Sequence, residues 1–122
     1  MSVENTGAFG ERIAAGYLTR KGYRILETGY RPRYGEIDII ARDGDTMVFV
    51  EVKTRTTAQY GTPEDAVNAG KIRRLLRAVQ SYVAAHPVGD YRIDVVAIDL
   101  DHGTRNARVR HYRHALGEEG RI

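Results

Sequence analysis

Two apolar segments separated by a short polar stretch constrain the fold of this chain more than any other feature. The strings GEIDIIA at residues 35–41 and FVEVKTR at residues 49–55 are rich in Ile and Val, which favours β-strands. Asp43-Gly44 between them is a strong hairpin signal. The sequence therefore predicts two neighbouring antiparallel strands, and the Val-rich second strand is expected to be covered on both faces.

Charged residues interrupt both predicted strands, although burying an unpaired charge is costly. Asp38 lies on the first strand, and Glu51 and Lys53 share one face of the second because side chains alternate along a strand. Asp38 can lie beside Glu51 only if the connecting loop has an even number of residues. A two-residue turn at 43–44 sets Asp38 diagonal to Glu51. A four-residue loop at 43–46 sets them directly opposite, with Cβ atoms roughly 5 Å apart.

Either register brings two carboxylates within reach of one ion, and carboxylate oxygens suit Mg²⁺ or Mn²⁺. Such a metal lowers the pKa of a bound water and offsets the charge that develops on a phosphodiester under attack. Lys53 is expected to orient that water or to stabilise the same charge. The pattern predicts a metal-dependent nuclease site with Asp38, Glu51 and Lys53 as catalytic residues. The alternative is that Glu51 and Lys53 form a solvated strand face or an ordinary salt bridge. The E-x-K spacing taken alone favours this alternative.

The length and composition are those of a soluble globular protein. With 122 residues the chain is expected to form a single domain over 1–122, with an ordered core at about 7–114 and a tail at 115–122. Cysteine is absent, which excludes disulfides, thiolate zinc sites and cysteine nucleophiles. The first residues lack a secretory signal pattern, and no apolar run reaches the ~20 residues of a membrane span. A cytoplasmic protein with no membrane association is therefore expected.

The remaining elements place the hairpin in an α/β fold. Apolar residues at helical spacing predict a helix over 7–21, and Thr62-Pro63 followed by two acids predicts the start of a second helix, bent or broken near Gly70. The strands are expected at Tyr23–Thr28, Glu36–Arg42, Met47–Thr54, Tyr91–Leu100 and Ala107–Tyr112. The order α-β-β-β-α-β-β predicts a mixed central sheet flanked by helices.

Four strings of this chain closely resemble the YraN family of small bacterial proteins: GERIAAGYLTRKGYRIL, GEIDIIARDGDTMVFVEVKTR, GTPEDAV and YRIDVVAID. Their pattern is similar to that of the restriction-endonuclease-like PD-(D/E)XK superfamily and, within it, to the archaeal Holliday-junction resolvases. The resemblance implies a restriction-endonuclease-like core, Mg²⁺ or Mn²⁺ as the cofactor, and cleavage of DNA, including branched DNA. It also implies Glu11 as a metal ligand beside Asp38 and Glu51.

Basic residues surround the predicted site and are expected to bind the backbone phosphates of nucleic acid. The net charge of +3 is a mild excess, but arginine outnumbers lysine and suits bidentate contacts with phosphate. The predicted nucleic-acid-binding residues lie in loops beside the strands and on the second helix: Arg31, Arg33, Arg55, Lys71, Arg73, Arg74 and Arg77. A solvated helix face is the alternative for any single arginine.

Loop aromatics and histidines carry weaker signals. Tyr30, Tyr34 and Tyr60 are expected to pack against the fold, with stacking on unpaired bases as the alternative. The histidines show no zinc-ligand spacing. His111 and His114 are expected on opposite faces of a strand, so no catalytic role is assigned to them.

Three functions remain open from the sequence. The first is an Mg²⁺- or Mn²⁺-dependent endonuclease that acts on DNA rather than RNA, and that needs to form a homodimer to cut two strands symmetrically. The second is a non-catalytic nucleic-acid-binding module of the same fold, whose DNA binding is sensitive to salt. The third is a protein-interaction subunit that contacts a partner through the face of residues 49–53.

Overall fold

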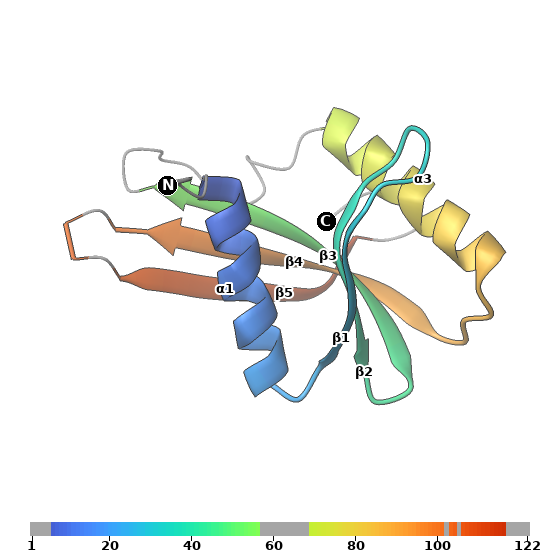
Figure 1. The fold of residues 1–122 in the computed structure, drawn as a ribbon, viewed down its shortest axis with the longest axis horizontal. Coiled ribbons are helices and arrows are strands. Elements are labelled where there is room, and N and C mark those ends of the chain that lie inside the picture. The colour runs from blue at the N-terminus through green and yellow to red at the C-terminus, as the bar shows by residue number, and fades with distance from the viewer. Residues whose placement is uncertain (1–5, 57–68, 102, 105, 117–122) are drawn as a thin grey trace, which may run out of the picture.

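The fold is a five-stranded mixed sheet with α1 on one face and α3 on the other (Figure 1). This computed structural model describes residues 6–56, 69–101, 103–104 and 106–116. The elements are α1 (Thr6–Arg20), β1 (Arg24–Tyr30), β2 (Ile37–Asp43), β3 (Thr46–Thr56), α3 (Ala69–Ala85), β4 (Tyr91–Leu100) and β5 (Ala107–Leu116). The strands lie side by side in the order β1-β2-β3-β4-β5. The predicted α/β class and the order α-β-β-β-α-β-β are both confirmed.

The β2–β3 hairpin adopts the second of the two registers that the sequence allowed. Arg42 pairs with Met47 and Asp43 with Thr46, so Gly44 and Asp45 form the turn. Gly44 has a φ of 61°, a left-handed conformation that glycine adopts without steric cost. Residues directly across the hairpin share a face of the sheet, and this even connection puts Asp38 and Glu51 on the same face.

β3 and β4 are parallel neighbours, and α3 crosses one face of the sheet between them. A crossover of this kind is what a parallel pair requires, since a tight turn can join only antiparallel strands. The helix start predicted at 62–65 lies outside the described residues, and α3 is described from Ala69 onward. In the part of the chain that the structure describes, no helix is long and apolar enough to span a bilayer.

Each face of the sheet carries its own apolar core. On one side α1 packs onto β2 and β3 through Ala14 and Leu18. On the other side α3 packs onto the same strands through Leu75 and Val79. The centre of β3 is therefore covered on both faces, as its Val-rich sequence predicted.

β3 extends beyond its pairing with β2. The β2–β3 ladder stops at Val50, whereas β3 continues to Thr56 alongside β4. The chain that precedes β2 runs instead toward α3, where the N–H of Glu36 donates to the Arg74 carbonyl at 3.2 Å. The beginnings of α1 and α3 both approach this end of β3 (Figure 1). The polar residues of the hairpin are gathered here.

β1 and β5 form the two edges of the sheet. The basic sequence of β5 thus belongs to an edge strand, where charge discourages pairing with other chains. The strand continues to Leu116, two residues beyond the predicted ordered core, and Ala115 and Leu116 are both buried.

Candidate active site

Asp38 and Glu51 are two buried acids that meet where the β2–β3 ladder ends. Only 5% of Asp38 and 1% of Glu51 are exposed. The last paired residues are Ile39 and Val50, so extending the register by one residue sets Asp38 across from Glu51. Both acids belong to the face that α3 covers, because side chains alternate along a strand and Phe49 packs in the α3 core.

Asp38 also completes the backbone hydrogen bonding of β3. The N–H of Val52 lies beyond the β2–β3 ladder and donates to Asp38 Oδ2 at 2.8 Å. A buried amide needs an acceptor, and this carboxylate supplies the one that β2 no longer provides. The bond holds the carboxylate at a fixed position beside Glu51.

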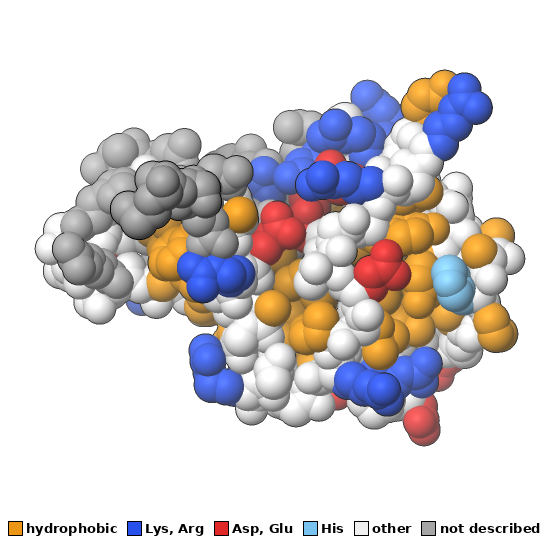
Figure 2. All heavy atoms as spheres, in the orientation of Figure 1, with side chains coloured by type: hydrophobic (Ala, Val, Ile, Leu, Met, Phe, Trp, Pro, Cys, Tyr) orange, Lys and Arg blue, Asp and Glu red, His pale blue; other side chains and the backbone are white. Residues whose placement is uncertain are grey.

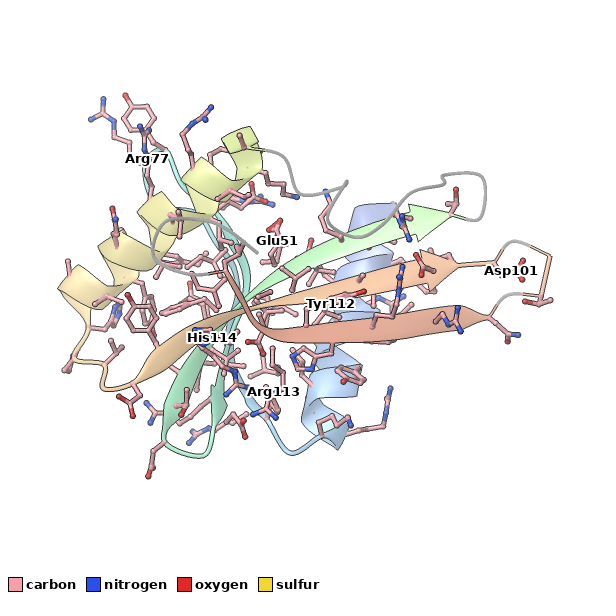
Figure 3. All side chains as sticks on the ribbon, turned by 180° about the vertical axis from the view of Figure 1, so that it is seen from behind. Glu51, Arg77, Asp101, Tyr112, Arg113 and His114 are labelled. Atoms are coloured by element: carbon pink, nitrogen blue, oxygen red, sulfur yellow. The ribbon has the colours of Figure 1, made fainter. Side chains whose placement is uncertain are left out.

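Glu51 lies between β3 and the beginning of α3, where it meets one cation (Figure 3). Lys71 Nζ is 3.1 Å from Glu51 Oε2. The contact is an ion pair, and Oε2 has no hydrogen-bond partner of good geometry among the described residues. Burial, together with the charge of Asp38, raises the pKa of Glu51 to about 8, although Lys71 opposes the shift. Glu51 is thus an acid that ionises only at some electrostatic cost.

The two lysines beside these acids differ in their electrostatic surroundings. Burial and the neighbouring charge of Lys71 lower the pKa of Lys53. Burial alone would also lower the pKa of Lys71, but the charges of Glu51 and Asp38 outweigh it and raise that pKa. Lys71 was predicted to contact phosphate, and the structure places it in an ion pair with a candidate metal ligand. The sequence gives no signal for this contact because the two residues are 20 positions apart.

A cavity of about 330 Å³ opens over this group and contains Glu11, Glu36, Asp38, Lys53 and Lys71 in its wall. Burial and then the charge of Asp38 raise the pKa of Glu11, which lies on α1. The structure therefore brings Glu11 to the same cavity as Asp38 and Lys53, whereas Glu51 lies buried beside Asp38 and does not line it. Among the described residues, however, no three His, Cys, Asp or Glu side chains converge closely enough to hold one metal ion.

A larger hollow of about 830 Å³ lies elsewhere, between α3 and the beginning of β4, with Val79 and Ile93 in its wall. None of the predicted site residues lines it. The buried carboxylate pair therefore places the candidate site at the smaller cavity.

Comparison with known proteins assigns the family. Residues 10–98 match the model of a family described as "Uncharacterised protein family UPF0102". A UPF0102 protein of Syntrophus aciditrophicus is 53% identical over 97 residues, which cover 78% of this chain and 76% of the relative. This chain belongs to the UPF0102 (YraN) family. UPF0102 proteins of Alkaliphilus oremlandii and Dehalococcoides mccartyi are also similar. The first is 49% identical over 98 residues, covering 77% of this chain and 84% of the relative. The second is 40% identical over 118 residues, covering 95% of this chain and 96% of the relative.

Most of the predicted nucleic-acid-binding residues of this UPF0102 protein lie near one another. Lys71, Arg73, Arg74 and Arg77 line a shallow hollow of about 360 Å³ on α3. Lys and Arg side chains gather over α3 and the loop between β1 and β2, next to acidic side chains (Figure 2). We call the exposed cations of this region the basic surface: Arg31, Arg33, Arg73, Arg74 and Arg77. Arg55 is different, because it pairs with Asp99 at 3.1 Å and only 13% of its side chain is exposed.

Asp94 is a third buried acid, and the sequence analysis assigned it no role. It accepts hydrogen bonds from Arg92 Nε at 3.0 Å and from the N–H of His114 at 2.9 Å, and its Oδ2 lies 2.7 Å from His111 Nε2. Burial raises the pKa of Asp94, but the bonds from His111, His114 and Arg92 outweigh it and hold that pKa below its usual value. An acid between the apolar residues Ile93 and Val95 is the same kind of signal that identified Asp38.

The Asp94 network joins elements on the α1 face of the UPF0102 domain. His111 Nδ1 lies 3.1 Å from the Tyr17 hydroxyl, and Arg92 donates to the Tyr23 hydroxyl at 2.6 Å. His111 and His114 both reach Asp94, one through its ring and the other through its backbone at a φ of 52°. None of these residues lines the candidate site cavity. The network links β4, β5 and α1.

Proposed function

We propose that this UPF0102 protein is a metal-dependent nuclease that hydrolyses phosphodiester bonds of DNA. The observation that carries the proposal is the pair of buried carboxylates, Asp38 and Glu51, on adjoining strands. Buried acids are unusual unless they are paired or hold a metal. Asp38 has one backbone donor, and Glu51 has one ion pair with Lys71. The pair is raised in energy by mutual repulsion, which a divalent cation relieves.

The donor set fits Mg²⁺ or Mn²⁺. Both ions prefer carboxylate oxygens and keep several waters in their shell. Glu51 Oε2 is buried and lacks a hydrogen-bond partner in the described part of the chain, which leaves it suited to a cation. Asp38 and Glu51 would hold the metal, and Glu11 in the cavity wall would add a third carboxylate through a water or a small rearrangement. When bound, the ion lowers the pKa of a water and offsets negative charge on the phosphate.

The lysines of the cavity supply positive charge where the phosphate would lie. Lys53 is half-buried in the cavity wall, and its lowered pKa suits it to orient a water or to transfer a proton. Lys71 now neutralises the side of Glu51 that a metal would take. Metal binding therefore requires Lys71 to move, and the same cavity would let its ammonium group meet a phosphate oxygen.

The basic surface extends this site toward a longer ligand. Its guanidinium groups lie beside the acidic cavity, and several arginines on one face are the usual electrostatic signature of a phosphate backbone. The likeness to PD-(D/E)XK nucleases supports DNA as the substrate, and the likeness to junction resolvases supports branched DNA. The family match by itself specifies no reaction.

Cleavage assays with matched variants test the proposal. Wild type would be incubated with Mg²⁺ and separately with Mn²⁺ on labelled four-way junction, flap, duplex and single-stranded DNA, and on RNA. Asp38→Asn keeps an acceptor for the Val52 amide, and Glu51→Gln keeps the shape of the acid, so both variants are expected to fold. We expect cleavage by wild type alone, with a loss of at least ~100-fold in either variant. Equal activity in all preparations would reject the site.

A non-catalytic nucleic-acid-binding module is the second candidate, and two observations favour it. Lys71 already neutralises Glu51, and the described residues hold no group of three metal-ligating side chains. This candidate predicts salt-sensitive DNA binding by the basic surface with no product in either metal. Isothermal titration with Mn²⁺ separates the two: the nuclease binds the ion and loses that binding in Asp38→Asn, whereas the binding module shows no difference.

A further inference from the structure

Tyr34 has an unusual position in the loop between β1 and β2. With 64% of its surface exposed, it is the most exposed large hydrophobic residue in the part of the chain that the structure describes. An exposed aromatic ring offers an apolar face that a ligand can cover. Tyr30, from the same region, packs instead against Tyr82 with ring centroids 5.4 Å apart. The packing that the sequence predicted for both residues therefore holds for Tyr30 and fails for Tyr34. Tyr60 lies outside the described residues.

The backbone that presents Tyr34 is strained. Pro32 to Gly35 forms a tight turn closed by the bond from the Gly35 N–H to the Pro32 carbonyl at 3.1 Å. Within it Tyr34 takes a φ of 65°, a left-handed conformation that side chains with a Cβ rarely adopt. Strain of this kind persists where surrounding structure imposes it, and it is common at functional sites.

The loop is held against α3, so the ring has a fixed direction. Gly35 lies so close to the helix that an added Cβ would come within 2.8 Å of the Ala78 amide nitrogen. The next residue, Glu36, donates its N–H to the Arg74 carbonyl. Figure 1 shows this loop rising beside α3. The ring is therefore presented by a rigid support and not by a loose loop.

One cation contacts the ring, and others lie on the neighbouring face of α3 and in the cavity wall. The Arg33 guanidinium lies 4.9 Å from the ring centroid and donates to the Tyr34 hydroxyl at 3.0 Å. Arg77 projects from the face of α3 at the same end of the molecule (Figure 3). Glu36, two residues after Tyr34, lies in the wall of the candidate site cavity. At no more than about 3.5 Å per residue, the four residues from Tyr34 to Asp38 span less than ~14 Å.

We infer that Tyr34 stacks on an unpaired base next to the phosphate that occupies the candidate site, so that the preferred ligand is DNA with a single-stranded segment. An exposed ring beside a guanidinium group and next to other exposed arginines is an arrangement that suits single strands, because bases stack on aromatic rings while arginines contact the phosphates. Paired bases offer no open face to such a ring. The inference rests on the proposed nuclease function for its substrate, but stacking itself requires no cleavage.

Equilibrium binding without divalent metal tests the inference independently of catalysis. Labelled single-stranded DNA and duplex of the same sequence would be titrated against wild type, Tyr34→Ala, Tyr34→Phe and Leu26→Ala, an exposed apolar control on β1. We expect Tyr34→Ala to weaken single-strand binding by about 5- to 100-fold and duplex binding by less than about twofold. Tyr34→Phe and Leu26→Ala should stay close to wild type. Circular dichroism melts would establish that each variant is folded.

A scan with abasic sites locates the stacked base. One abasic position is moved along the single strand and affinity is measured for wild type and Tyr34→Ala. Stacking predicts one position at which base loss weakens wild type but has no further effect on Tyr34→Ala. Equal losses on single strand and duplex, or no such position, would overturn the inference. If stacking holds while no metal supports cleavage, the nuclease proposal alone fails. If cleavage occurs and Tyr34→Ala keeps the wild-type preference, the stacking inference alone fails.

Discussion

At the scale of single residues, Glu51 shows how neighbours set the chemistry of a side chain. An isolated Glu ionises near pH 4.5, but burial and Asp38 raise the pKa of Glu51 to about 8. The carboxyl group of Glu51 therefore keeps its proton to a higher pH than that of an isolated Glu. Binding of a divalent cation requires the ionised form, so proton release and metal binding are coupled at this residue.

The metal-free protein is expected to lose stability as pH rises from about 4.5 to about 8. In this window the folded state holds a proton on Glu51 that the unfolded state has released, so the free energy of unfolding falls with pH. At about 1.4 kcal/mol per pKa unit, we expect a decline of roughly 2–5 kcal/mol. Urea unfolding in chelator at pH 5 and pH 8.5 measures it. Glu51→Gln cannot titrate and should lack this component; equal pH dependence in both proteins would contradict the shift.

Tyr34 provides a second prediction at this scale. Tyr34→Gly and Tyr34→Ala both remove the ring, but only glycine adopts a φ of 65° without strain. We expect Tyr34→Gly to be more stable than Tyr34→Ala by about 1 kcal/mol. Thermal and urea unfolding of the two variants measure the difference. Equal stability would show that the backbone at Tyr34 relaxes in the variants.

At the scale of elements, α1 and β3 approach so closely that only glycine fits between them. A Cβ at Gly10 would overlap Thr54 Oγ1 and come within 2.9 Å of the Thr54 Cβ. The same helix contains Gly16, where an added Cβ would meet only the flexible end of Arg20 at 3.4 Å. The contact at Gly10 sets how near the beginning of α1, and with it Glu11, comes to the candidate site.

The two glycines form a matched pair of tests. Gly10→Ala is expected to destabilise the fold by about 1–3 kcal/mol because the backbones must separate. Gly16→Ala is expected to stabilise it by up to about 1 kcal/mol, since alanine is the better helix former. Urea unfolding measures both. A neutral Gly10→Ala would indicate that α1 can move away from β3 without cost.

At the scale of the whole molecule, the two faces of the sheet hold different polar groups. The α3 face carries Asp38 and Glu51 beside a cavity, with a repulsion between like charges that Lys71 and Lys53 offset in part. The α1 face carries Asp94, whose partners lower its pKa. A network whose polar groups are satisfied stabilises the fold, whereas an unbalanced cluster is available to a ligand. This contrast is the reason to place function on the α3 face.

DNA binding is expected to weaken as the salt concentration rises, because the arginines of the basic surface neutralise backbone phosphates. Each arginine that neutralises a phosphate contributes about 0.9 to the slope of log K against log salt for duplex DNA. Arg73→Ala/Arg77→Ala should therefore reduce that slope by about 2, whereas Arg24→Ala on β1 should leave it unchanged. Titrations at several salt concentrations measure the slopes. An unchanged slope in the double variant would exclude α3 from the interface.

The sequence by itself determined the strands, the hairpin and the predicted convergence of Asp38 with Glu51. These features follow from turn residues and from apolar residues that repeat every two positions in a strand and every 3.6 in a helix. Both signals act over a few neighbouring positions. It allowed two registers, because both turns are even, and only the fold selected the one that sets the acids opposite each other. It also missed the Lys71 ion pair and the Asp94 network, and it wrongly expected Tyr34 to pack against the fold. These three features depend on contacts between distant positions, which the crossover of α3 and the order of the strands bring together. Contacts of this kind leave no periodic pattern in the sequence.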